Sequence, residues 1–251
     1  MSTSNGKRVK VAEWKSPRSG IVFSIEIATE EDRDLLEKFL NEQTRVQEPI
    51  IASMGTRVGE MSNVFEGMID RSVGSGLTLL MFNEEKDLIG IRMASKCKMP
   101  EKKLTGEFKL LPDYKDLIDR QPGSSRKNQQ VSALMEIMYG WAPSFLPDDC
   151  EDYFCMELIN LMPQYRNEGL ATKLYQELFK VAASKGLQFG EVICTAKASQ
   201  RVCHKLGMRV KLEIDYDKFL DGGQVCVRDT NDGSQFCQLL IADLKEMGYF
   251  E

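Results

Sequence analysis

Three residues at fixed spacing, Arg166-x-x-Gly169-x-Ala171, form a pattern that could bind an anionic ligand. Gly169 and Ala171 are small, so a ligand can approach the backbone closely. Apolar residues recur at helical spacing after Gly169, so the pattern opens a helix. The first turn of a helix has unpaired N–H groups and a positive dipole end. Because Arg166 adds a permanent charge, the sequence predicts an anion site suited to a pyrophosphate.

The segment before this turn has the pattern of a buried strand. Residues 153–161 are mostly apolar and lie between Asp152 and Pro163. Pro163 ends the strand because proline has no N–H to donate to a ladder. The local order is therefore strand, tight turn, helix.

The remaining periodicity predicts an α/β protein with a mixed sheet. Residues 100–150 interrupt the strand pattern, and apolar side chains within them recur at helical spacing, so they are expected to form a helical insertion. Residues 1–20 are basic and polar and are expected to be a flexible arm. The other predicted strands are 21–27, 77–82, 88–94, 189–195, 208–216 and 236–241. The other predicted helices are one beginning after Thr29, 61–69 and 199–206.

Composition limits the class of protein. The chain has 251 residues, 42% hydrophobic and 28% charged, as in ordinary soluble domains. Its net charge of −5 argues against nucleic acid as the main partner, and no apolar run is long enough to span a membrane. Seven cysteines without a Cys-x-x-Cys pair favour reduced thiols, a cytoplasmic location and no metal site. A monomer or weak dimer is expected.

The turn and a later helix carry a family resemblance. The pattern from Arg166 to Ala171 resembles the acyl-CoA motif of the GNAT superfamily of N-acetyltransferases, Gln/Arg-x-x-Gly-x-Gly/Ala. Residues 199–208 resemble the closing helix of that family. The resemblance implies one GNAT domain over 21–251, with about seven strands flanked by helices and the 100–150 insertion before the fourth strand. It implies acetyl-CoA as co-substrate, bound by Ile159, Asn160, Leu161, Met162, Gln164, Arg166, Asn167, Glu168, Gly169, Leu170, Ala171 and Thr172.

Other residues resemble one branch of that family, the arylalkylamine (dopamine) N-acetyltransferases of invertebrates. Many family members have a general-acid tyrosine at the position of Cys203. The arylalkylamine branch lacks this tyrosine, as this chain does. A Glu48-Pro49 pair and the run Ser199-Gln200-Arg201-Val202 match the branch, with Thr195 in place of a serine. The resemblance implies that Glu48, Ser199 and Thr195 are catalytic.

Formation of the amide requires a base, a hydrogen-bond donor to the oxyanion and a hydrogen-bond donor to the departing thiolate. An alkylammonium has a pKa near ~10 and must lose a proton before it attacks a thioester, for which Glu48 is a suitable base. A backbone N–H at Leu161–Met162 could stabilise the oxyanion. Ser199 could hydrogen-bond the departing thiolate. The pantetheine arm would lie along residues 159–161 like an added strand.

The sequence therefore predicts an acetyl-CoA-dependent N-acetyltransferase for a small aromatic amine such as dopamine or serotonin. Met135, Met138 and Trp141 of the insertion are the expected walls of the acceptor pocket. The alternatives are a protein or peptide N-acetyltransferase of the same fold and a non-catalytic CoA-sensing module. At the level of single residues, Glu48 could be a surface acid, Ser199 a helix cap and Cys203 an acetyl carrier.

Overall fold

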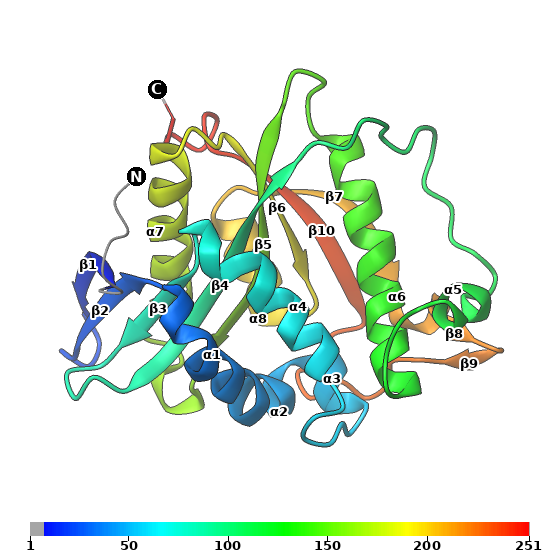
Figure 1. Cartoon of the computed structure of the whole chain (residues 1–251), viewed down its shortest axis with the longest axis horizontal. Coiled ribbons are helices and arrows are strands. Elements are labelled where there is room, and N and C mark those ends of the chain that lie inside the picture. Colours follow the sequence, from blue (N-terminus) through cyan, green and yellow to red (C-terminus); the bar gives the residue numbers. More distant parts are fainter. Residues whose placement is uncertain (1–7, 251) are drawn as a thin grey trace.

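An eight-stranded sheet runs through the described part of the chain, residues 8–250 of this computed structural model (Figure 1). The strand order is β1-β2-β3-β4-β5-β6-β10-β7, and a short ribbon of β8 and β9 lies apart from it. Every adjacent pair is antiparallel except β5 and β6, so the sheet is mixed, as predicted. The strands are β1 Val9–Lys15, β2 Val22–Ile27, β3 Leu79–Phe82, β4 Leu88–Lys98, β5 Asp152–Leu161, β6 Phe189–Cys194, β7 Arg209–Asp215, β8 Leu220–Asp221, β9 Gln224–Val225 and β10 Phe236–Asp243.

Strand β1 was not predicted. Residues 1–20 were expected to be a flexible arm, but 9–15 pair with β2 along the edge of the sheet, so that expectation is wrong for this stretch. The reason is Trp14, which stacks on Phe23 with ring centroids 6.2 Å apart and gives the edge strand an apolar anchor. Residues 1–7 lie outside the described part.

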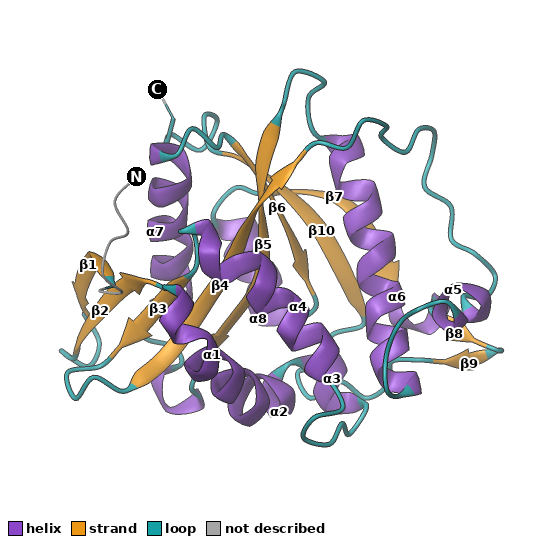
Figure 2. Ribbon diagram, in the orientation of Figure 1, coloured by secondary structure: helices purple, strands orange, loops and turns teal. Residues whose placement is uncertain are grey.

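Helices cover both faces of the sheet (Figure 2). Helices α1, α3, α4, α5 and α6 pack on one face, and α7 and α8 pack on the other, so two apolar cores flank the strands. The helices are α1 Arg33–Phe39, α2 Arg45–Gln47, α3 Pro49–Ser53, α4 Ser62–Ser72, α5 Lys115–Asp119, α6 Arg126–Trp141, α7 Leu170–Ser184 and α8 Lys197–Lys205. A π-helical turn, Leu40–Thr44, joins α1 to α2, and single 3-10 turns lie at Glu30–Asp32, Val73–Ser75, Ala142–Phe145, Pro163–Tyr165 and Tyr216–Lys218.

The segment 100–150 contains α5 and α6 and lies between β4 and β5. Ser125 begins α6 by accepting a hydrogen bond from the N–H of Asn128, and Val131, Leu134 and Met138 face the core. Helix α6 therefore stands over the sheet next to α4 (Figure 1).

Helix α8 starts two residues before its predicted start. Ala196 is its N-cap and has no side-chain acceptor, but Asp232 accepts a hydrogen bond from the N–H of Lys197 at 2.7 Å. A distant residue thus supplies the cap. Ser199 lies inside the first turn, so the interpretation of Ser199 as a helix cap is wrong.

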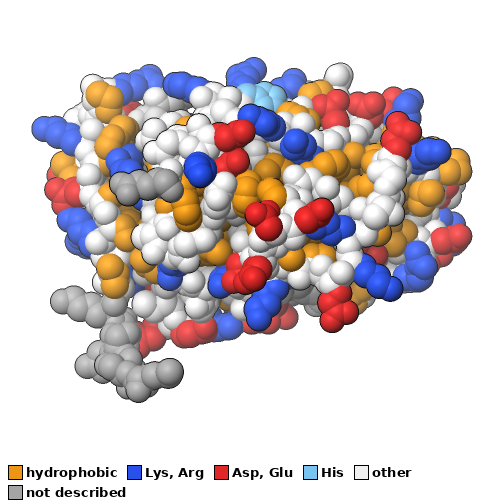
Figure 3. Space-filling model, turned by 90° about the horizontal axis from the view of Figure 1, so that it is seen from above, with side chains coloured by type: hydrophobic (Ala, Val, Ile, Leu, Met, Phe, Trp, Pro, Cys, Tyr) orange, Lys and Arg blue, Asp and Glu red, His pale blue; other side chains and the backbone are white. Residues whose placement is uncertain are grey.

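The molecular surface mixes charges of both signs, as Figure 3 shows for the face seen from above. None of the helices within residues 8–250 is long and apolar enough to cross a bilayer.

Candidate functional site

A gap between β5 and β6 is the central feature of the site. The two strands pair only through Phe154, Cys155 and Met156, which meet Gly190, Glu191 and Val192. Beyond Met156, β5 continues its ladder with β4 as far as Leu161, whereas β6 stays paired with β10. Within the described chain no residue of β5 after Met156 pairs with β6. The sheet therefore opens toward the C-terminal ends of both strands and leaves an unpaired backbone edge on β5.

The direction of the N–H groups on this edge decides which one could donate to a ligand. The N–H of Met162 donates to the carbonyl of Ile89 at 2.8 Å, so it faces β4 and is not available. Successive N–H groups point to opposite edges of a strand, so the N–H groups of Leu161 and Ile159 face the gap. The prediction that Met162 could supply the oxyanion donor is wrong, and Leu161 is the better candidate.

One short segment, residues 44–48, bridges the mouth of the gap. On the β5 side, Asn160 donates to the hydroxyl of Thr44 at 3.2 Å. The guanidinium of Arg166, just after β5, donates to the side chain of Gln47 at 2.7 Å. On the β6 side, the hydroxyl of Thr195 donates to Glu48 at 2.7 Å. The segment thus holds Glu48 between the ends of the two separated strands.

Both oxygens of the Glu48 carboxylate accept hydrogen bonds. One accepts from Thr195, and the other accepts from the N–H of Ile51 at 2.7 Å, which makes Glu48 the N-cap of α3. Glu48 has extended backbone geometry before Pro49, as expected for a residue that precedes proline. Desolvation of the half-buried side chain raises the pKa of Glu48, although the hydrogen bonds from Ile51 and Thr195 oppose the shift. A raised pKa makes the carboxylate a stronger base.

The residues predicted to be catalytic lie in one neighbourhood. Thr195 follows β6 directly and is fixed by Tyr216, whose hydroxyl donates to the carbonyl of Thr195 at 3.1 Å. Ser199 is four residues further along, in the first turn of α8, and donates to the carbonyl of Ala196 at 2.8 Å. Glu48 and Thr195 therefore touch, whereas Ser199 is near them without a direct hydrogen bond to either.

A buried polar cluster lies on the α7–α8 side of the gap. Cys203 is fully buried, with its sulfur 3.4 Å from that of Cys194 and 3.2 Å from the hydroxyl of Tyr175. Arg92 is also fully buried, with its guanidinium 4.2 Å from the centre of the Tyr175 ring, and none of its nitrogens has a hydrogen-bond partner among the described residues. Interaction with Cys194 lowers the pKa of the Cys203 thiol.

The predicted anion-binding turn has the expected backbone. Gly169 is the N-cap of α7 with φ +82°, a left-handed conformation that favours glycine, and Asn167 also has positive φ. The first-turn N–H groups of α7 have no intrahelical acceptors. Arg166 is exposed, whereas Leu170 is buried in the core, so only the backbone of Leu170 can contact a ligand.

The loop after β1 closes one side of this turn. The hydroxyl of Ser16 donates to Glu168, and Arg18 donates to the carbonyl of Asn167 at 3.4 Å. The ring of Trp14 is 3.6 Å from the place a Cβ would occupy at Gly169. The sequence motif alone gave no sign of these contacts.

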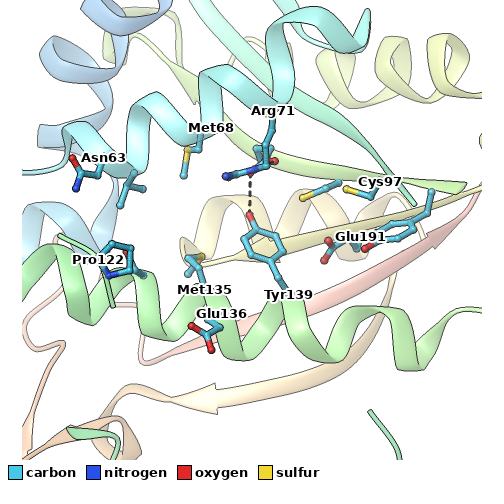
Figure 4. A pocket seen from close by; sticks show the side chains of 14 residues that line it. Asn63, Met68, Arg71, Cys97, Pro122, Met135, Glu136, Tyr139 and Glu191 are labelled. Carbon is cyan, nitrogen blue, oxygen red and sulfur yellow. Dashed lines mark hydrogen bonds and ion pairs between the residues drawn. The ribbon is translucent and has the colours of Figure 1, made fainter. Parts of the chain in front are cut away.

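A cavity of about 440 Å³ lies between α4, α6 and the sheet (Figure 4). Its floor includes Glu157, which pairs with Arg71 through two hydrogen bonds of 2.9 and 2.8 Å and also accepts from Tyr139 at 3.3 Å. Glu191 is 1% exposed, and one of its oxygens has no hydrogen-bond partner in the described structure. The lining residues are Asn63, Val64, Met68, Arg71, Cys97, Pro122, Ser132, Met135, Glu136, Tyr139, Tyr153, Cys155, Glu157 and Glu191.

The three predicted pocket walls have different positions. Met135 lines the cavity. Met138 is fully buried in the core, and Trp141 packs edge-on against Phe108 with ring centroids 5.6 Å apart. Neither Met138 nor Trp141 is among the residues that line the cavity. The sequence signal that was missed is the pair of acids inside apolar strands, Glu157 and Glu191.

Comparison with solved structures identifies the fold. A protein of the mosquito Aedes aegypti described as arylalkylamine N-acetyltransferase 7 superposes with TM-score 0.76 at 14% identity, covering 97% of this chain and 98% of that one. The chain has the GNAT fold. Arylalkylamine N-acetyltransferase 2 of Aedes aegypti gives TM-score 0.72 at 16% identity, covering 88% and 99% of the two chains. The polyamine N-acetyltransferase of Drosophila melanogaster gives 0.68 at 16% identity with the same coverage.

The predicted order of strand, turn and helix is confirmed, because β5 is followed by the turn at Gly169 and by α7. No protein-family model and no curated protein sequence matches the chain. The reaction is therefore inferred from the chemistry of the site. Within residues 8–250, no group of three or more His, Cys, Asp or Glu side chains is placed to hold a metal ion.

Proposed function

We propose that this protein is an acetyl-CoA-dependent N-acetyltransferase that acts on a small primary amine. The observation that carries the proposal is the bridge across the gap, where Glu48 bonds to Thr195 while its neighbour Gln47 bonds to Arg166. A base with a raised pKa is thereby linked to the anion-binding turn through adjacent residues.

The residues fit acetyl-CoA at both ends of the gap. Arg166 and the first-turn N–H groups of α7 suit the pyrophosphate, and the left-handed Gly169 leaves the backbone open to it. The unpaired edge of β5 suits the amide groups of the pantetheine arm. When bound, acetyl-CoA supplies an activated acetyl thioester.

Four residues are assigned to the chemical step. Glu48 takes a proton from the acceptor ammonium, directly or through water. Thr195 holds the Glu48 carboxylate in position, and the N–H of Leu161 donates a hydrogen bond to the acyl oxygen. Ser199 donates to the departing sulfur after it rotates away from the carbonyl of Ala196.

The proposal extends to the class of amine that accepts the acetyl group. The sequence favours an arylalkylamine such as dopamine or serotonin, and two structural neighbours carry that name. Another neighbour is named for polyamines, so the fold alone does not choose. Action in the cytoplasm by a monomer or weak dimer completes the proposal.

The test is a panel of primary amines with acetyl-CoA, with released thiol as the readout. The panel contains arylalkylamines, alkylamines, diamines and short basic peptides. Thiol release that depends on a small amine supports the proposal. Tight acetyl-CoA binding in calorimetry without release by any amine or peptide would point to a CoA-sensing module instead, and release by peptides only would indicate a peptide N-acetyltransferase.

A further inference from the structure

One face of β6 connects the proposed base to the cavity. Side chains two residues apart point to the same face of a strand, so Glu191, Ile193 and Thr195 form one row. Thr195 bonds to Glu48, Ile193 is a partly buried apolar residue, and Glu191 borders the cavity. The row covers about 13 Å from Glu191 to Thr195.

Strand β5 gives a second row beside the first. Glu157 borders the cavity at the point where β5 and β6 separate, because the last paired residue of β5 is Met156. Leu158 follows as a partly exposed apolar residue, and Asn160 reaches Thr44 in the bridging segment. The cavity and the proposed transfer site thus lie along the same two strands, and Leu158 and Ile193 between them are apolar and only partly buried.

The two carboxyl groups at the cavity end have different partners. Arg71 neutralises Glu157 through two hydrogen bonds. Glu191 has no basic partner among the described residues, and its unpaired oxygen is buried. Desolvation raises the pKa of Glu191 well above its usual range, and a cationic ligand beside this carboxyl group would stabilise its ionised form.

We infer that the cavity binds the far end of the acceptor and that this end is a cation, so the preferred substrates are diamines or guanidinoalkyl amines. The reacting amine lies at Glu48, a methylene chain crosses Leu158 and Ile193, and the second cation lies at Glu191. Met68, Met135 and Val64 form walls that suit methylene groups. The inference rests on the proposed function and narrows its substrate class.

The same arrangement predicts weaker binding of an aromatic acceptor. An aromatic ring would fill the apolar middle, but it would supply no positive charge to the carboxyl group of Glu191. A second ammonium or guanidinium group can reach Glu191 and hydrogen-bond it directly.

The kinetic test compares matched acceptors in the full chain with acetyl-CoA. Pentylamine and 1,5-diaminopentane differ only in the second amine, and 2-phenylethylamine represents arylalkylamines. Glu191→Gln keeps the shape and removes the acidic group, whereas Glu66→Gln removes a carboxylate from the exposed side of α4, outside the residues that line the cavity, and is the control. We expect Glu191→Gln to lower kcat/KM for the diamine roughly 10- to 100-fold, the scale of one charged hydrogen bond, with pentylamine little changed. Glu66→Gln should leave kcat/KM for both amines unchanged.

A binding test separates this inference from the proposed reaction. Calorimetry measures the affinity of 1,5-diaminopentane for the wild type, Glu191→Gln and Glu66→Gln without turnover, and thermal melting checks that each variant is folded. A loss of diamine binding confined to Glu191→Gln supports the inference even if no amine is acetylated. Equal affinity in folded wild type and Glu191→Gln would overturn it. Equal kcat/KM for pentylamine and the diamine in the wild type would also overturn it, although the acetyltransferase proposal would stand.

Discussion

Glu48 combines two tasks at the scale of one residue. It caps α3 through the N–H of Ile51, and its other oxygen accepts from Thr195. The cap fixes the direction of the carboxylate, and burial raises its pKa. A glutamate can therefore be structurally required and still be placed to accept a proton.

The first prediction concerns Glu48→Gln. The amide oxygen can still cap α3 but is no base, so turnover should fall roughly 10²- to 10⁴-fold. In the wild type, kcat/KM should rise with pH through the raised pKa of Glu48, because the base is active only when ionised. The Glu48→Gln variant should lack this rise of kcat/KM with pH. Its kcat/KM should recover partly at high pH, where more of the acceptor amine is already neutral.

The measurement is the pH–rate profile of both proteins with one amine. Glu60→Gln is the control, because Glu60 accepts a backbone hydrogen bond from Arg57 at the same distance of 2.7 Å without lying at the gap. Parallel profiles for wild type and Glu48→Gln would leave Glu48 as a cap only.

Ser199→Ala tests the proposed hydrogen bond to the departing sulfur. Ser199 does not cap α8, so removing the hydroxyl should change stability by less than about 1 kcal/mol. We expect kcat to fall roughly tenfold or more while the KM for acetyl-CoA stays near the wild-type value. Ser184→Ala is the control, since its hydroxyl makes the same kind of bond to the carbonyl of Val181 at the end of α7. Equal kcat in the two variants would remove Ser199 from the mechanism.

At the scale of elements, the start of α7 depends on the backbone of Gly169. Alanine there must adopt a positive φ, which costs about 1–2 kcal/mol, and its Cβ would narrow the approach to the N–H groups. Gly186 follows the other end of α7 with φ +76°, and the place that a Cβ would occupy there is open space. Both Gly→Ala variants should lose similar stability, but only Gly169→Ala should weaken CoA binding, by roughly tenfold. Calorimetry measures the CoA affinity of the two variants. Equal affinities would mean that the anion binds elsewhere.

Helix α6 presents two methionines to different surroundings. Met138 is fully buried, so Met138→Ala should destabilise the fold by about 2–5 kcal/mol and affect all amines alike. Met135 lines the cavity, so Met135→Ala should change the ranking of amines with a smaller loss of stability. Chemical denaturation and kcat/KM for three amines measure the two effects. The idea that Met135 contacts the acceptor fails if the ranking is unchanged.

At the scale of the whole molecule, the first strand reaches the turn that precedes α7. Trp14 of β1 lies beside Gly169, more than 150 residues away in the sequence. Trp14→Ala should raise the Kd for CoA several-fold by removing one wall of the turn, with the KM for the amine little changed. Val9→Ala on the same strand is the control, because Val9 is 61% exposed. Unchanged CoA affinity in Trp14→Ala would limit β1 to an edge-strand role.

The sequence by itself determined the order of the main elements and the position of the turn at Gly169 before α7. These features depend on neighbours in the chain, such as the apolar run before Pro163 and the helical spacing after Gly169. Periodicity did not reveal β1, because its edge position is fixed by contacts with Phe23 and the turn at Gly169.

Only the tertiary structure decided which side chains meet. The fold brings Glu48 and Thr195 into hydrogen-bond contact and turns the N–H of Met162 toward β4, away from the gap. It also buries Met138 in the core while Met135 lines the cavity. The physical reason is that the register between β4 and β5, the end of pairing between β5 and β6, and the rotation of α6 set these contacts. Each depends on how distant segments pack, and no local pattern in the sequence encodes it.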